Sequence, residues 1–226
     1  MGIVREGSAN TSSRSQLPLE LQALVDVHQS VWMRITQGSS VGVQKRFASY
    51  VHDYLEGSRE QVCFRSQRRY PSFDDLLDMR RKSAGVAPLF ALAEYALKLD
   101  IPEEVFQSKA VREIQQIGVD FVVISFSLET SQNDILSYCK EETEGVPHNL
   151  VVLTRYQMEC SNDPLRAHPQ AAFDRVGGLL TKLYQRWFLA LSTLPSWGER
   201  VDADVQRYIA SVRAIVAANL NWRSSG

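Results

Sequence analysis

The sequence is poor in the residues that mark several common kinds of protein. Its three cysteines, Cys63, Cys139 and Cys160, are odd in number and form no CxxC pair, so neither a disulfide framework nor a zinc site is indicated. This cysteine usage is typical of a reducing compartment, and we expect a cytoplasmic protein. The four histidines have no HExxH spacing, and no GxSxG motif or glycine-rich phosphate loop occurs. Metalloprotease, hydrolase and P-loop functions therefore lack support.

The chain also lacks an excess of charge of either sign. Lys and Arg number 25 and Asp and Glu 26, which gives a formal net charge of -1 at pH 7. A nucleic-acid partner needs a basic surface, and the run RSQRRY at 65–70 is too short to form one. No stretch reaches about 18 uninterrupted apolar residues, so we expect no membrane span. Residues 1–18 have no apolar run of signal-peptide length, and we expect a short disordered lead there.

What the sequence does contain is apolar residues at helical spacing, separated by glycine, proline and serine, which predicts an all-α protein. Expected helices cover 19–35, 43–64, the segment from Ser72 to a break at Gly85, its continuation to Leu99, a short helix from IPEE, then 111–142, 148–159, 170–194 and 201–220. The second helix carries one apolar stripe of Phe47, Tyr50, Val51, Tyr54 and Leu55. With no internal repeat and no long linker, residues 19–226 are expected to form one helical domain.

Residues 133–141, NDILSYCKE, place three oxygen-bearing side chains at four-residue intervals. In a helix, Asn133, Ser137 and Glu141 fall within about 80° of one another over roughly 12 Å. An amide, a hydroxyl and a carboxylate are hard ligands of the kind that Mg²⁺ accepts beside water and phosphate. Lys140 adds a cation that can reach a phosphate. The spacing fits either a metal held against an anion or a polar, solvated helix face.

The surrounding sequence favours the metal interpretation. NDILSYCKEE followed by EGVPHNLV resembles the magnesium-binding segment of class I terpene cyclases, which has the pattern N/D-D-x-x-S-x-x-x-E, often a basic residue before the Glu, and HNLV downstream. The resemblance is nearest to fungal, especially basidiomycete, sesquiterpene synthases. It extends through YPSFDDLLDMRRKSAGVAPLFALAEYAL to AANLNW and covers about residues 19–222. It implies a class I terpenoid synthase-like helical bundle, of which this chain would be the C-terminal two-thirds.

The resemblance implies a substrate and a metal for the helix face described above. Asn133, Ser137 and Glu141 would bind one of three Mg²⁺ ions that hold the diphosphate of a prenyl diphosphate, farnesyl diphosphate being expected. Lys140 would hydrogen-bond the diphosphate. Trp222 would correspond to an aromatic residue of the cavity whose π face stabilises a carbocation. Ionisation of the substrate would then be followed by cyclisation in a cavity that excludes water.

The segment MRRKSAG matches the family's helix break. Arg80 would be the arginine that senses the diphosphate, with Arg81 as the alternative sensor. Ser83 would be the linker residue, and the carbonyl of Ala84 the effector. Gly85 would allow the kink. Without the resemblance, two adjacent arginines are typical of a solvated helix face.

Three features depart from the family pattern. DDLLD at 74–78 matches an aspartate-rich metal motif, but it adjoins the sensor arginines, so we interpret it as the acidic first turn of a helix. The family's own motif would then precede residue 1. FSLETSQ at 126–132 separates VVIS from NDI, and in a regular helix it would move the ligands by about 10 Å along the axis. The family's C-terminal Arg-Tyr pair is absent, with Arg223 as a weak substitute.

Two hypotheses follow. One is a cyclase that ionises farnesyl diphosphate with Mg²⁺. The other is a truncated, non-catalytic terpene synthase-like protein that lacks the aspartate-rich motif. Missing helices would expose part of the apolar wall, which predicts association between copies or poor solubility. A cyclase should have a deep apolar cavity with Asn133, Ser137, Glu141 and Arg80 at its mouth. Trp187 and Phe188 are expected in the core.

Overall fold

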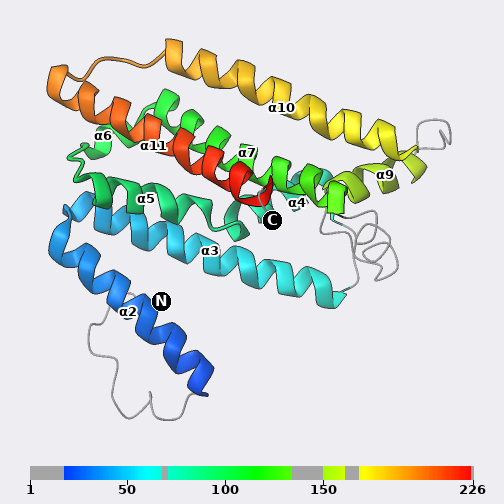
Figure 1. Cartoon of the computed structure of the whole chain (residues 1–226), viewed down its shortest axis with the longest axis horizontal. Coiled ribbons are helices and arrows are strands. Elements are labelled where there is room, and N and C mark those ends of the chain that lie inside the picture. The colour runs from blue at the N-terminus through cyan, green and yellow to red at the C-terminus, as the bar shows by residue number, and fades with distance from the viewer. Residues whose placement is uncertain (1–17, 68–70, 134–149, 161–167, 225–226) are drawn as a thin grey trace.

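The computed structural model describes residues 18–67, 71–133, 150–160 and 168–224 (Figure 1). Within these ranges the regular structure is helical, which confirms the all-α prediction. The helices are α2 (Leu19–Gly38), α3 (Val41–Gln67), α4 (Phe73–Ser83), α5 (Val86–Leu97), α6 (Glu103–Gln107), α7 (Lys109–Asn133), α9 (Leu150–Cys160), α10 (Pro169–Ser192) and α11 (Glu199–Ser224). None of them has the length and apolar content that a membrane crossing requires.

Helix α7 is the centre of the bundle, since it contacts α4, α5, α6, α9, α10 and α11. Helix α3 packs against α4 and α5, and α2 contacts α3. In Figure 1 the long helices run side by side, with α10 along one edge and α3 along the other. Helix α2 leaves the bundle at an angle to α3. The core therefore lies around α7.

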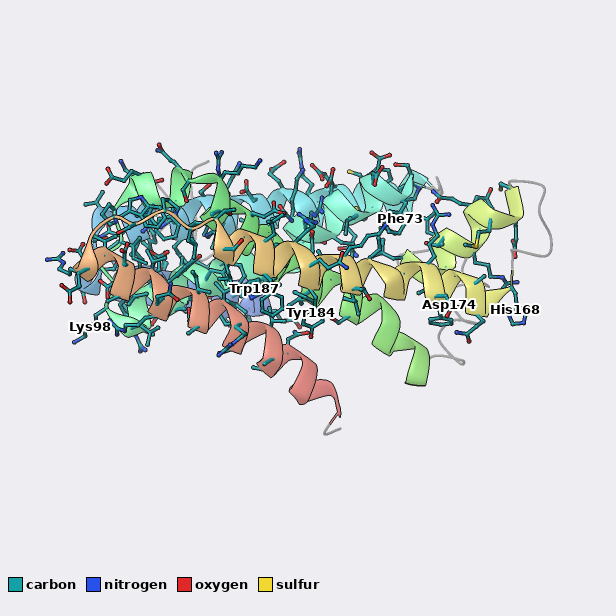
Figure 2. All side chains as sticks on the ribbon, turned by 90° about the horizontal axis from the view of Figure 1, so that it is seen from above. Phe73, Lys98, His168, Asp174, Tyr184 and Trp187 are labelled. Carbon is teal, nitrogen blue, oxygen red and sulfur yellow. The ribbon has the colours of Figure 1, made fainter. Side chains whose placement is uncertain are left out.

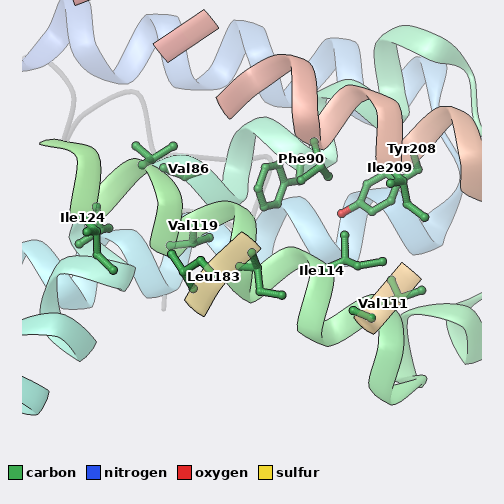
Figure 3. Packing of buried hydrophobic residues seen from close by; sticks show 14 of the residues in the cluster. Val86, Phe90, Val111, Ile114, Val119, Ile124, Leu183, Tyr208 and Ile209 are labelled. Atoms are coloured by element: carbon green, nitrogen blue, oxygen red, sulfur yellow. The ribbon is translucent and has the colours of Figure 1, made fainter. Parts of the chain in front are cut away.

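Close packing at α7 depends on a glycine in the middle of the helix. Phe90 of α5 and Tyr208 of α11 are each 1% exposed and lie near Ile114, which is fully buried (Figure 3). A Cβ atom on Gly118 would lie 2.8 Å from Val212 Cγ1 and 3.1 Å from Phe90 Cζ. Glycine is unfavourable inside a helix by roughly 1 kcal/mol relative to alanine. Here it lets α5 and α11 approach α7 closely.

The break between α4 and α5 forms as the sequence predicts. Ser72 caps α4: its Oγ accepts from the backbone N–H of Asp75 at 3.1 Å, and Asp75 Oδ2 accepts from the N–H of Ser72 at 3.4 Å. Gly85 ends the segment with φ of 68°, a left-handed conformation that glycine adopts without strain. The capping box and the break are both confirmed.

Helix α7 continues through 126–132 and ends at Asn133. No loop therefore absorbs the seven residues before Asn133, and at about 1.5 Å per residue they carry it roughly 10 Å along the axis. The side chains of 126–133 are not described. Ser137, Lys140 and Glu141 lie outside the described residues, as do 1–17.

Two expectations about apolar side chains are only partly correct. The stripe on α3 is half covered, since Tyr54 is 37% and Leu55 50% exposed. On α10, Trp187 packs against the core, whereas Phe188 is 65% exposed, so its expected burial was wrong (Figure 2 shows Trp187 and Tyr184 on this helix). Helical periodicity identifies a stripe, but it does not say which neighbour covers it.

Candidate functional site

Arg81, near the end of α4, binds a carboxylate through each nitrogen of its guanidinium. Its Nε donates to Asp120 Oδ1 at 2.7 Å, and its Nη2 donates to Asp120 Oδ2 at 2.9 Å. Its Nη1 donates to Asp78 Oδ1 at 2.6 Å. These contacts, with the hydrogen bond to Asp120 the largest cause, raise the pKa of Arg81. Arg81 thus ties α4 to α7.

The carboxylate of Asp120 contacts side chains from three helices at this end of the bundle. It is 1% exposed and also accepts from Gln116 Nε2 at 3.0 Å. Arg186 of α10 lies 3.9 Å away through Nη1 and donates through Nε to Glu113 at 2.8 Å. A buried charge is tolerated when it is paired in this way. Asp120 therefore joins α4, α7 and α10.

Arg80, Ser83 and Ala84 are the other residues of the break. The Nε of Arg80 and the Oγ of Ser83 are enclosed by protein atoms, and within the described residues Ser83 Oγ has no hydrogen-bond partner. Ala84 is exposed, and its N–H donates to the carbonyl of Arg80 at 2.9 Å. A Cβ atom on Gly57 of α3 would lie 2.8 Å from the backbone nitrogen of Ser83, so α3 packs tightly against the break.

A cleft of about 330 Å³ lies next to the break, between α3, α4, α5 and α7. It combines apolar, polar and charged side chains, and the carboxylate of Asp53 lines it together with three cationic residues. The apolar lining is Ala87, Phe90 and Val119, and the cationic lining is Arg81, Lys82 and Arg112. Arg81 lines this cleft and Arg80 does not. The expected cavity with Arg80 at its mouth is therefore not formed by this cleft.

Two tyrosines and a glutamine form a polar cluster, of which Tyr50 and Gln115 line the same cleft. Gln115 Nε2 donates to Tyr50 Oη at 2.9 Å and to Tyr208 Oη at 2.7 Å. Burial raises the pKa of Tyr50 and raises that of Tyr208 well above its usual value. Both phenols consequently stay neutral at physiological pH. The cluster links α3, α7 and α11.

A buried ion pair lies one turn before Tyr50 on α3. Arg46 donates through Nε to Glu94 Oε1 at 3.1 Å and through Nη2 to Oε2 at 2.6 Å. Its Nη1 donates to Glu103 at 2.6 Å, and its guanidinium lies 3.8 Å from the ring centre of Phe106. Burial is the largest cause of the raised pKa of Glu94. Sequence reasoning missed this pair, although a glutamate inside FALAEYAL was a usable signal.

Of the three proposed metal ligands, Asn133, Ser137 and Glu141, the structure describes only the backbone of Asn133. Within the ranges that the structure describes, no cluster of three or more His, Cys, Asp or Glu could hold a metal ion. Asp75 and Asp78 are engaged with Ser72 and Arg81, which supports the interpretation of DDLLD as a helix start. The backbone of Asn133 ends α7, and that of Trp222 lies in α11.

A second cleft, of about 560 Å³, lies between the start of α7 and the end of α10. The ion pair between Glu113 and Arg186 lines it, together with Leu189 and Pro195. No residue that the sequence marked as functional borders it.

Residues 5–186 match the model of terpene synthase family 2, C-terminal metal binding. The chain is 32% identical over 201 residues to a silphinene synthase of Penicillium patulum and 31% identical over 205 residues to a (+)-eremophilene synthase of Gibberella fujikuroi. These alignments cover 89% and 90% of this chain but 50% and 53% of the two enzymes. The chain thus spans about half the length of the curated relatives it matches.

Solved structures share the fold. A linalool/nerolidol synthase from Streptomyces clavuligerus superimposes with a TM-score of 0.75 at 21% identity, over 92% of this chain and 67% of that chain. An a-eudesmol synthase superimposes with a TM-score of 0.77 at 14% identity, over 93% of this chain and 64% of that chain. These similarities show the fold of the chain.

Proposed function

We propose that this chain, which belongs to the terpene synthase family, supplies the diphosphate- and metal-binding part of a sesquiterpene synthase. Such an enzyme would ionise farnesyl diphosphate with Mg²⁺, release diphosphate and cyclise the carbocation. The observation that carries the proposal is the break between α4 and α5. It places Arg80, Ser83 and Ala84 at the end of α4, next to a cleft that Arg81 and Lys82 line.

Arg80 is the candidate for the residue that senses the diphosphate, because it matches the family pattern at the helix break. Arg81 already binds two carboxylates through all of its nitrogens, so it would have to give up hydrogen bonds to a buried aspartate to reach a ligand. The role of Arg81 is to hold the end of α4 against α7.

The donor set proposed for the metal fits Mg²⁺, because amide, hydroxyl and carboxylate oxygens are hard ligands. Asn133, Ser137 and Glu141 would hold the ion, which would stabilise the charge that develops on the leaving diphosphate. Lys140 would bind the diphosphate by a hydrogen bond. Phe90, with the other apolar side chains of the cleft, would shield the prenyl chain from water, and Trp222 would line the cavity.

Incubation with farnesyl diphosphate and Mg²⁺, with products identified by gas chromatography and mass spectrometry, tests the proposal. We expect a cyclic sesquiterpene that is lost in Asn133→Ala and Glu141→Ala. Arg59→Ala, at an exposed position on α3, is the matched control and should keep the product. A product that survives both metal-site substitutions would contradict the proposed metal site.

A second candidate is a non-catalytic synthase-like protein, and one observation favours it. Helix α7 runs unbroken through 126–132, which moves Asn133 by about 10 Å relative to the family pattern. The metal ligands would then miss a diphosphate bound at the helix break. This candidate predicts no product from the folded chain.

A further inference from the structure

One side of α3 contacts the helix break at three successive points. A Cβ atom on Gly85 would lie 3.5 Å from Cδ2 and Cε2 of Tyr54, so the tyrosine ring lies against the glycine of the break. The carboxylate of Glu60 accepts from Lys82 Nζ at 3.1 and 3.2 Å. Gly57 lies between these two contacts, and a Cβ atom there would lie 2.4 Å from Lys82 Cβ. We call Tyr54, Gly57 and Glu60 the α3 contact face.

The contact face lies apart from the residues of α3 that line the cleft. Each step of three residues moves about 60° around a helix, so Tyr54, Gly57 and Glu60 span about 120°. None of the three lines the cleft between α3, α4, α5 and α7, whereas Tyr50 and Asp53 of the same helix do. Any effect of the contact face on a ligand must therefore pass through the break.

Gly57 is the residue on which this contact depends most. Glycine weakens the interior of a helix relative to alanine, yet α3 has one here. A Cβ atom on Gly57 would also lie 2.8 Å from the backbone nitrogen of Ser83. Because carbon atoms in contact lie about 3.5–4.0 Å apart, alanine at this position would require α3 and the break to separate by roughly 1 Å.

Within the described residues, hydrogen bonds to α7 hold only the first part of the break. Arg81 binds a buried carboxylate of α7. Ser83 Oγ is enclosed by protein atoms without a hydrogen-bond partner, and the N–H of Ala84 donates to the carbonyl of Arg80 in the same helix end. Contacts with α3 are therefore the ones that hold residues 82–85 against another helix.

We propose that the α3 contact face sets the position of the break and, through it, the position of Arg80 and the Ala84 carbonyl relative to a bound diphosphate. The inference rests on the proposed function, because it assigns positioning residues to the same site. A displacement of about 1 Å can reduce a reaction rate by about 100-fold, so a movement of the size that Gly57→Ala requires is large enough to measure.

Hydrogen exchange of the chain alone tests whether α3 sets the position of the break. In Gly57→Ala we expect the amides of 82–86 to exchange about tenfold or more faster than in the unchanged chain. Gly38→Ala is the matched control, because its Cβ atom would lie 2.9 Å from Tyr95 Cε2 at a different helix contact. It should leave exchange at 82–86 unchanged. No acceleration in Gly57→Ala, or equal acceleration in both variants, would overturn the proposal.

Binding of inorganic diphosphate with Mg²⁺, measured by titration calorimetry, tests the consequence for the site. We expect the dissociation constant to rise about tenfold or more in Gly57→Ala and to stay within about twofold in Gly38→Ala. Both variants are measured below their unfolding transitions, where a loss of stability alone does not change the constant. An unchanged constant in Gly57→Ala, or an equal rise in Gly38→Ala, would contradict the positioning role.

Tyr54→Ala takes the place of Gly57→Ala in both tests if that variant does not fold, because it removes the ring from Gly85 without adding an atom. Its control is Tyr184→Ala, which removes an exposed ring from α10. If the unchanged chain binds no diphosphate, the proposed function fails, and with it the role of the contact face in binding. The exchange experiment uses no ligand, so it still decides whether α3 sets the position of the break.

Discussion

Replacing Arg46 by methionine should destabilise the protein strongly, because it isolates a buried carboxylate. The side chain of Glu94 has no exposed surface and is held by two hydrogen bonds from Arg46. Breaking a buried pair by removing one partner costs about 3–5 kcal/mol. The lost contact with the ring of Phe106 adds roughly 0.5–2 kcal/mol. Together these losses are a large fraction of the free energy of unfolding, which is about 5–15 kcal/mol for a protein domain.

The loss of stability in Arg46→Met should also depend on pH, and the burial of Glu94 decides whether stability falls or rises with pH. Burial raises the pKa of Glu94, and Arg46 opposes that rise, so the pKa should climb further in Arg46→Met. A carboxyl whose folded pKa exceeds its unfolded value binds more protons when folded. Stability of the variant should therefore fall as pH rises from the unfolded value, about 4.3, to the raised folded value.

Urea unfolding followed by circular dichroism at pH 5 and pH 8 measures both effects. The double variant Arg46→Met/Glu94→Gln should recover part of the stability at pH 8, because a neutral amide is less costly to bury than a charge. Arg59→Met, at an exposed ion pair with Glu56, is the matched control and should change stability by less than about 1 kcal/mol. A loss below about 1 kcal/mol at pH 8 in Arg46→Met would show that the buried Glu94 does not depend on Arg46 as its partner.

Three further substitutions test the elements around the helix break by the same unfolding assay. Asp120→Asn should cost about 3–5 kcal/mol, because it leaves Arg81 without its buried partner, and a neutral result would remove Asp120 from the account. Gly57→Ala should cost about 1–3 kcal/mol, because the new Cβ would lie 2.4 Å from Lys82 Cβ, whereas Gly178→Ala, with open space, should be neutral or stabilising. Ser72→Ala should cost about 0.5–2 kcal/mol through loss of the cap.

Local signals in the sequence predicted the helices and the break well. The cap at Ser72 and the glycine at 85 act through backbone groups only a few residues away, so sequence alone locates them. The pairing of Arg81 with Asp120 joins residues 39 positions apart, and no local pattern announces it. That contact distinguishes the two arginines of MRRKSAG.

Burial of individual side chains was harder to predict, because it depends on which helix packs against which. Phe188 and Leu55 have the hydrophobicity of core residues but lie on faces that no described helix fully covers. Arg46 and Glu94 are charged, yet each is more than 90% buried because they neutralise each other. In both cases, contacts between different helices determined which side chains are buried.

Binding of inorganic diphosphate to the isolated chain, measured by titration calorimetry with and without Mg²⁺, tests the proposed diphosphate and metal site. We expect binding that requires Mg²⁺ and that weakens by about tenfold or more in both Arg80→Gln and Asn133→Ala. Binding that is equally tight without Mg²⁺, or that neither substitution changes, would contradict it.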